Sequence, residues 1–376
     1  MALMSQPLFA GVYEGRRVLV TGHTGFKGSW LALWLRQLDA QVCGLALPPA
    51  TEPSHHALLN LGIEEAFVDL RDADGVRRTV QALAPDIVFH LAAQPLVRRS
   101  YAEPAGTLAT NVMGLVHLFE AVRATPSVRA VVNVTTDKCY ANRHQAQGYT
   151  EDDALGGHDP YSASKACAEI VSASYRASFL SNDDSRGHPV LLATARAGNV
   201  IGGGDWSEDR LIPDLVRAAL AAEPARIRHP GSTRPWQHVL EPLAGYLLLG
   251  QQLLQGRGEQ AQAWNFGPDE AGHLSVGEVV SGFSAHWPSL RHELGGQDAT
   301  RHEAALLHLD CGKARARLGW RPVWDAPTSL ARTARWYRAW HERGERLSQA
   351  DLDAYVEDAR RHGLAWAGQT SGWVPA

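Results

Sequence analysis

A tyrosine and a lysine, Tyr161 and Lys165, are the residues of this chain whose types and spacing most clearly predict chemistry. Because they stand at positions i and i+4, their side chains share one face if the segment is helical. A free phenol titrates at about pH 10, and a nearby ammonium or another positive charge favours phenolate and lowers that pKa. The pair therefore predicts a base that takes a proton from an alcohol while the carbon loses a hydride. The alternative is a tyrosine packed in the core beside a surface lysine.

The chain uses very few lysines, and three of the four stand in motifs suited to chemistry. Lys27 lies in a glycine-rich segment, Lys138 ends a Thr-Thr-Asp-Lys segment, and Lys165 belongs to the Tyr-x3-Lys pair. An ammonium is a compact charge whose pKa shifts readily on burial, whereas a guanidinium stays charged. Lysine at these places indicates a need for a movable pKa.

An acid and a base stand side by side at the end of a predicted strand. Thr136, Asp137 and Lys138 follow the apolar stretch 130–134, and open parallel sheets bind ligands at the carboxyl ends of their strands. A simple dehydrogenase needs only one hydroxyl there, so the added acid and base predict a second proton transfer. The alternatives are that Asp137 caps a turn and that Lys138 is a solvated surface charge.

A glycine-rich turn predicts a dinucleotide site. Gly22, Gly25 and Gly28 lie between the first apolar stretch and a helical pattern, where a pyrophosphate would rest on backbone N–H groups at the start of the helix. Asp69 and Leu70 are expected to contact the adenine, although Asp69 would serve equally well as a turn cap. The other expected cofactor-binding residues are Thr24, Phe26, Leu91, Ala92, Ala93 and Gln94, together with Tyr161 and Lys165.

The segment expected to meet the adenosine ribose lacks a charged group. An acid at the end of the second strand, roughly 20 residues beyond the glycines, would bind the ribose hydroxyls of NAD, and an arginine would accommodate a 2′-phosphate. Residues 45–48 read Leu-Ala-Leu-Pro instead. We therefore expect NAD rather than NADP.

Apolar stretches that alternate with helical patterns predict the frame that positions these groups. Continuous apolar strands are typical of parallel sheets covered on both faces, which predicts an α/β fold with a doubly wound parallel Rossmann sheet. After residue 195 the alternation ends, and irregular helices and loops predict a smaller carboxy-terminal substrate lobe. The predicted strands are 17–21, 41–47, 66–70, 87–91, 130–134 and 190–195, with helices after residue 28 and at 72–83, 104–122 and 161–179. The predicted units are an NAD-binding domain over 12–196 with contributions from about 239–266, a substrate lobe over 197–238 and 267–345, and an extension over 346–376.

Bulk composition argues against several other classes of function. The net charge of −4, with interspersed signs, predicts neither a nucleic-acid face nor a membrane anchor. The amino terminus does not read as a signal peptide, and no uninterrupted apolar run approaches the roughly 18 to 20 residues that span a bilayer. The four scattered cysteines predict reduced thiols in the cytoplasm. The 17 histidines show no metal-binding spacing, so His55 and His56 are expected at the surface and no metal is assigned.

The order of these motifs resembles the extended short-chain dehydrogenase/reductase family of nucleotide-sugar enzymes. The motifs are Thr-Gly-x-x-Gly-Phe-x-Gly, Leu-Ala-Ala-Gln, Tyr-x3-Lys and Ala-Arg-Ala-Gly-Asn-Val. Over nearly its full length the chain is similar, more narrowly, to the 4,6-dehydratases of that family that act on CDP-glucose. The Thr-Asp-Lys motif and Leu-Pro-Pro-x-Thr-Glu-Pro at 47–53 are the more specific segments, whereas the glycine motif is generic.

The resemblance implies an NAD-dependent conversion of CDP-glucose to CDP-4-keto-6-deoxyglucose and water, within dideoxyhexose synthesis for cell-surface polysaccharide. Tyr161, with Thr136 hydrogen-bonded to the same oxygen, would deprotonate the 4-hydroxyl as C4 is oxidised. Lys138, or a water it holds, would remove the C5 proton, and Asp137 would protonate the C6 hydroxyl as water leaves. The related dTDP-glucose dehydratases carry Glu where this chain has Lys138, and an ammonium must lose its proton before it serves as a base.

The resemblance also implies substrate contacts. Asn199 and Arg234 correspond to family residues that meet the diphosphate, and a guanidinium suits bidentate pairing with phosphate. Arg210 and Leu211 open a helix that covers the nucleotide in this family. Arg301 is expected near the nucleotide too, although it would equally be a solvated charge.

The family further implies a cytoplasmic homodimer or tetramer that pairs through helices near 104–123 and 161–179. Rival functions stay open at this point. A 4-epimerase lacks the adjacent acid and base. The residues do not show which nucleobase the substrate carries, so a dehydratase for a different nucleotide sugar stays open. A non-catalytic NAD-binding regulator is disfavoured because Thr136, Tyr161 and Lys165 are intact.

Overall fold

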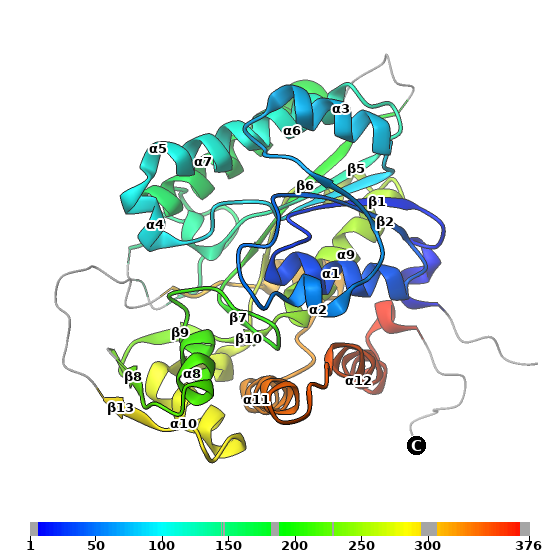
Figure 1. The fold of residues 1–376 in the computed structure, drawn as a ribbon. Helices are drawn as coiled ribbons and strands as arrows, with labels where there is room; N and C mark the ends of the chain where they lie inside the picture. Colours follow the sequence, from blue (N-terminus) through cyan, green and yellow to red (C-terminus); the bar gives the residue numbers. More distant parts are fainter. Residues whose placement is uncertain are drawn as a thin grey trace, which may run out of the picture.

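The computed structural model describes residues 7–143, 145, 147–181, 188–227, 229–294 and 307–368. Within these residues a seven-stranded sheet forms the centre of the protein, and its strands all pair in parallel (Figure 1). The strand order β11-β6-β5-β4-β1-β2-β3 runs outward from β1 in both directions, which confirms the predicted doubly wound Rossmann sheet. The strands are β1 (Arg17–Thr21), β2 (Gln41–Ala46), β3 (Glu64–Phe67), β4 (Ile87–His90), β5 (Ala130–Val134), β6 (Leu191–Ala197) and β11 (Ala263–Phe266).

Alternate residues of the buried strands face two separate helical layers. In β1, Val18 and Val20 belong to one apolar core and Leu19 to the other. Because both faces of the sheet are covered, its strands are continuous apolar runs. One layer contains α1 (Phe26–Gln37) and α9 (Leu240–Leu254), and the other contains α3 (Ala73–Leu83), α6 (Gly114–Arg123) and α7 (Pro160–Tyr175) (Figure 1).

The downstream half of the chain builds a further core, in which Trp206, Phe283 and Trp336 are buried. Its elements lie together below the sheet in Figure 1. The division into domains expected from the sequence stays a prediction. These elements are β7 (Val200–Ile201), α8 (Leu211–Leu220), β8 (Ala225–Ile227), β9 (Thr233–Pro235), β10 (Gln237–His238), β12 (His273–Ser275), α10 (Val276–His286), β13 (His292–Leu294) and α11 (Ala326–Arg343).

The carboxy-terminal segment, to which the sequence alone gave no role, joins the main core. It forms α12 (Ser348–Arg361) and a 3-10 turn that carries Trp366. The Trp366 ring stacks on Phe9 with centroids 5.0 Å apart and meets Trp34 edge to face at 5.7 Å. The two ends of the described chain therefore pack against each other.

The third strand ends earlier than its sequence prediction. It covers residues 64–67 rather than 66–70. The Val68 N–H makes a further hydrogen bond to β2, and Asp69 then accepts the Arg71 N–H at 2.9 Å, which turns the chain away from the sheet. Two short helices that the pattern did not predict also appear, α2 (His55–Leu59) and α4 (Val97–Ala102).

The helix predicted over 104–122 contains a π-helical turn. This turn, Ala109–Met113, lies between α5 (Pro104–Leu108) and α6. Its Asn111 side chain accepts the Gln94 N–H at 2.8 Å and donates to Ser164 Oγ at 2.9 Å, which ties the helix to a loop and to α7. By length and composition alone the stretch Pro104–Arg123 would suffice to cross a membrane, with a mean hydropathy of 1.2 and 44% of the apolar window buried, but core helices of soluble proteins pass the same test.

Candidate active site

A cleft of about 1880 Å³ opens at the carboxyl ends of the central strands. Residues that follow β1, β2, β4, β5 and β6 form one side, and segments from the downstream half of the chain form the other. Every predicted site residue in the described part of the chain lies on these walls, whereas Arg301 falls outside the described residues. Those on the walls are Gly22, Thr24, Gly25, Phe26, Gly28, Asp69, Leu70, Leu91, Ala92, Ala93, Gln94, Thr136, Asp137, Lys138, Tyr161, Lys165, Asn199, Arg210, Leu211 and Arg234.

The glycine turn has the form that a pyrophosphate site requires. Gly22 has a φ of +73°, and a Cβ there would lie 2.7 Å from the Ala92 nitrogen. A Cβ on Gly28 would lie 2.1 Å from the Gly22 carbonyl oxygen, so the turn and the helix pack too closely for a side chain. Gly25, the N-cap of α1, supplies no side-chain cap. The N-cap side chain therefore does not compete for the first N–H groups of α1, and the donor set fits a dinucleotide phosphate.

Asp69, expected at the adenine, is engaged by a neighbouring arginine. The Arg71 guanidinium donates to its carboxylate, with a shortest distance of 2.6 Å. These hydrogen bonds hold the pKa of Asp69 below its usual value. The geometry therefore matches the alternative in which Asp69 caps a turn, and its contact with the adenine stays a prediction.

Thr136, Asp137 and Lys138 form a compact polar group directly after β5. The Thr136 hydroxyl donates to Asp137 Oδ1 at 2.8 Å and accepts the Lys138 backbone N–H at 3.3 Å, so Thr136 rather than Asp137 caps the short turn. Lys138 Nζ lies 3.8 Å from Asp137 Oδ1. The Asp137 side chain is 2% exposed and the Lys138 side chain 31% exposed, so a buried carboxylate faces an ammonium that solvent can reach.

Tyr161 and Lys165 share one face of α7, as their spacing predicts. Asp159 caps this helix by accepting the Ser162 N–H at 2.9 Å, and Lys165 Nζ donates to the Val134 carbonyl at 3.3 Å. Burial raises the pKa of Tyr161 to about 12, more than its hydrogen bond with Thr136 lowers it. Burial also lowers the pKa of Lys165 to about 8. The Tyr161 shift is opposite to the one that the neighbouring ammonium led us to expect, because desolvation of the phenolate outweighs the opposing interactions.

A buried ion pair that the sequence analysis missed fixes this helix to the sheet. Glu169 accepts hydrogen bonds from Arg196 at 2.8 Å and from Thr194 at 2.7 Å, and both charged side chains are 3% exposed. Glu169 stands one turn beyond Lys165, so it belongs to the same helical face and stabilises the ammonium. An acid at i+4 from a candidate catalytic lysine was the signal available in the sequence.

Lys27, one of the lysines expected to need a movable pKa, also lies on the cleft wall. Its Nζ lies 3.5 Å from the Tyr246 hydroxyl. Burial, assisted by the charges of Arg210, Lys165 and Lys138, lowers the pKa of Lys27 to about 7. The scarcity of lysine was thus the signal that pointed to this wall.

The cleft also carries the residues expected to meet the substrate. Arg210 precedes α8, and its Nη1 lies 2.9 Å from Asp205 Oδ2, which raises the pKa of the guanidinium. Arg234 in β9 donates to the Thr233 carbonyl at 2.9 Å. Asn199 lies on the same cleft between β6 and β7. Two guanidinium groups and an amide thus line the cleft that holds the acid–base residues, a set suited to phosphate.

Comparisons with known proteins agree with this architecture. The NAD dependent epimerase/dehydratase family matches residues 18–267. A CDP-glucose 4,6-dehydratase of Salmonella typhimurium is 46% identical over 354 residues, which cover 93% of this chain and 98% of that protein. A dTDP-glucose 4,6-dehydratase of Xanthomonas campestris is 28% identical, over 85% of this chain and 92% of that protein.

Solved structures give the same result. A dTDP-glucose 4,6-dehydratase of Streptomyces venezuelae, crystallised with NAD, superposes with a TM-score of 0.71 at 26% identity and covers 87% of this chain and 98% of that one. A UDP-glucose 4-epimerase of Thermotoga maritima has a TM-score of 0.74 at 21% identity, over 87% of this chain and 100% of that one, and shows the fold alone. From the extent of these matches, the chain belongs to the NAD dependent epimerase/dehydratase family.

Proposed function

We propose that this protein is an NAD-dependent hydro-lyase that converts CDP-glucose to CDP-4-keto-6-deoxyglucose and water. The observation that carries the proposal is the buried Asp137 carboxyl group, which accepts a hydrogen bond from the Thr136 hydroxyl and lies 3.8 Å from Lys138 Nζ in the cleft that also contains Tyr161 and Lys165. Alcohol oxidation needs a tyrosine base alone, whereas elimination of water needs a further acid and base. The 46% identity to a CDP-glucose 4,6-dehydratase supports this substrate over other nucleotide sugars.

NAD is the cofactor of this family, and when bound it takes a hydride from the sugar and returns it in the same cycle. We infer that the turn of Gly22, Gly25 and Gly28 holds the pyrophosphate against the start of α1. Thr24, Phe26 and the loop from Leu91 to Gln94 would complete the cofactor wall, with Asp69 and Leu70 at the adenine.

Tyr161 would act first, at the C4 hydroxyl. Its phenolate takes the hydroxyl proton while Thr136 turns its own hydroxyl proton from Asp137 to the same oxygen. Because burial favours the neutral phenol, the positive charge of Lys165 is needed close by to make the phenolate accessible. A ketone at C4 then makes the C5 proton acidic.

Lys138 and Asp137 would act second, at C5 and C6. Lys138 in its neutral form takes the C5 proton, and protonated Asp137 donates to the C6 hydroxyl, which leaves as water. Lys138 later returns a proton to C5. Over the cycle C4 loses two hydrogens, C6 exchanges its hydroxyl for one hydrogen, and one water is released. The proton that Tyr161 took returns through solvent to Asp137, which restores both groups, so atoms and protons balance.

Deuterium at C4 of CDP-glucose tests this sequence of steps. The label should appear at C6 of the product, within the same molecule, because the cofactor is regenerated in every cycle. A 4-epimerase would return the label to C4, a simple dehydrogenase would release it with the reduced cofactor, and a regulator would leave the substrate unchanged. Any of those three outcomes, read by mass spectrometry and NMR of the product, would refute the dehydratase.

The substrate wall is proposed to bind the nucleotide diphosphate. Asn199 and Arg234 would meet the diphosphate, and Arg210 and Leu211 would cover the nucleotide at the start of α8. Arg301, outside the described residues, is proposed for the nucleotide on its sequence position alone. In this proposal residues 12–196, with about 239–266, form the NAD domain, residues 197–238 and 267–345 form the nucleotide-sugar lobe, and 346–376 extend the chain.

We also propose a cytoplasmic homodimer, or a tetramer built from it, that serves dideoxyhexose synthesis for lipopolysaccharide. The support is an apolar surface on α4, α5 and α7 and the π-helical turns that continue α5 and α7. Five of the seven large apolar side chains that are exposed lie there, among the described residues: Tyr101, Leu108, Met113, Ile170 and Phe179. A monomer by light scattering at micromolar concentration would contradict the assembly.

A further inference from the structure

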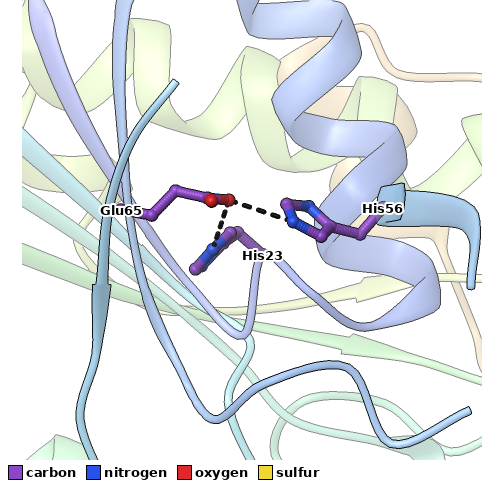
Figure 2. A group of neighbouring side chains, drawn as sticks. All are labelled: His23, His56 and Glu65. Carbon is purple, nitrogen blue, oxygen red and sulfur yellow. Dashed lines mark hydrogen bonds and ion pairs between the residues drawn. The ribbon is translucent and has the colours of Figure 1, made fainter. Parts of the chain in front are cut away.

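Three side chains that are far apart in the sequence meet behind the glycine turn. His23 comes from the turn itself, His56 from α2 and Glu65 from β3, and Figure 2 shows both imidazoles directed at the carboxylate. His23 Nε2 lies 3.0 Å from Glu65 Oε1, and His56 Nε2 lies 3.1 Å from the same oxygen. One ligand atom from each side chain lies within 4.8 Å of the other two.

Two imidazoles and a carboxylate are ordinary zinc ligands, and a water would complete a tetrahedral site. With metal–ligand bonds of about 2.1 Å, neighbouring ligand atoms of a tetrahedral site lie about 3.4 Å apart. The observed separations of 3.0 and 3.1 Å need to widen by a few tenths of an ångström to admit an ion, and the two imidazole nitrogens already lie within 4.8 Å of each other.

The buried ring of His23 has an environment that suits metal binding. Its side chain is 0% exposed, and burial favours the neutral imidazole that binds metals. A Cβ on Gly44 would lie 2.5 Å from the ring, so the strand beneath holds the ring in place. Among the described residues His23 Nδ1 has no hydrogen-bond partner of good geometry. A metal on Nε2 would place a proton on Nδ1, where the Leu45 carbonyl is the backbone acceptor that acts on this ring.

We propose that His23, His56 and Glu65 bind one divalent transition-metal ion, of which zinc is the best match to the ligands. In the described part of the chain, none of these three residues lines the cleft, so the ion would be structural rather than catalytic. His23 stands between Gly22 and Thr24, both of which line the cleft. The ion would thus fix α2 and β3 to the turn that receives the cofactor phosphates.

Sequence reasoning assigned no metal because the ligands come from three elements and follow no spacing rule. It also expected His55 and His56 together at the surface, which is wrong for His55. That ring is buried, with Nδ1 2.8 Å from Ser29 Oγ and Nε2 2.8 Å from Ser348 Oγ. The neighbouring His56 side chain is 17% exposed and points toward Glu65.

Metal binding by the full chain tests the proposal. After removal of metals with a chelator, titration with zinc chloride in a calorimeter should show one tight site per chain, and Co²⁺ should give the visible absorption of a tetrahedral nitrogen–oxygen site. Glu65→Gln and His56→Ala should each weaken binding by at least about tenfold, since even outer partners of metal ligands matter that much. Zinc should raise the thermal midpoint of the parent protein and of neither variant.

Glu64→Gln is the matched control. Glu64 is the adjacent residue of the same strand, and it pairs with Arg17 at 3.1 Å instead of with the histidines. Its variant should bind zinc like the parent. The proposal is overturned if the parent shows no stoichiometric zinc binding, or if His56→Ala and Glu65→Gln bind as well as Glu64→Gln. Either result would leave the cluster as a hydrogen-bonded group only. His56 is partly exposed on a short helix, so its variant keeps the test valid if Glu65→Gln fails to fold.

Discussion

Replacing Tyr161 with phenylalanine should lower turnover far more than it lowers the stability of the folded protein. The change removes one oxygen from a side chain that is 9% exposed and keeps the ring. If Tyr161 is the base, turnover should fall by about 10² to 10⁴-fold, a rise of about 2.7 to 5.4 kcal/mol in activation free energy. The free energy of unfolding should change by only about 1 kcal/mol, because the hydrogen bond with Thr136 is what is lost.

The pH dependence of turnover provides a second test of Tyr161. Burial raises the pKa of Tyr161 to about 12. Below that pH the reactive phenolate is the minor form, and its population grows about tenfold with each pH unit. Turnover of the parent should therefore increase with pH up to about 8, where Lys165 loses its proton, and Tyr161→Phe should lose that increase.

Tyr355→Phe is the matched control, because it removes the oxygen of another buried tyrosine that does not line the cleft. Tyr355 donates to Glu241 Oε2 at 2.8 Å, so the variant should lose about 1 to 3 kcal/mol of unfolding free energy while turnover per folded molecule is unchanged. Product formation and urea unfolding followed by circular dichroism measure the two quantities. Turnover of Tyr161→Phe within twofold of the parent would refute the assignment.

Three other perturbations have defined outcomes. Asp137→Asn should stop the reaction after oxidation, because an amide cannot protonate the leaving hydroxyl, and mass spectrometry should find the 4-keto-glucose nucleotide; normal release of water would make Asp137 structural. Glu169→Gln should cost about 3 to 5 kcal/mol of unfolding free energy, since its buried arginine partner would lose the carboxylate charge, and a loss below about 1 kcal/mol in denaturant unfolding would contradict this. Acid should destabilise the protein as pH falls below about 6.5, because burial lowers the pKa of three histidines to about 3. The stability that these neutral rings contribute is complete above their unfolded pKa and is lost as pH falls from that value toward about 3. A thermal midpoint that stays constant between about pH 7 and 4 would contradict this prediction. The three are His55, His90 and His238.

The sequence by itself determined the sheet and the position of the reactive motifs on it. Apolar runs such as 130–134 can be buried only in a sheet covered on both faces, and the carboxyl ends of parallel strands lie at one edge. Gly22 follows such a run directly and Thr136 comes two residues after one, so both had to reach the same cleft. The i and i+4 spacing of Tyr161 and Lys165 is likewise a local property, and it survived folding unchanged.

Only the tertiary structure decided which distant side chains meet and how burial changes them. Glu169 with Arg196, and His23 with Glu65, come from separate elements, so no local period encodes their contact. The same holds for the pKa of Tyr161, which burial raises although a neighbouring ammonium predicted the reverse. The spacing of apolar and polar residues reflects the conformation of a single segment. Desolvation and ion pairing depend instead on every segment that packs around a group.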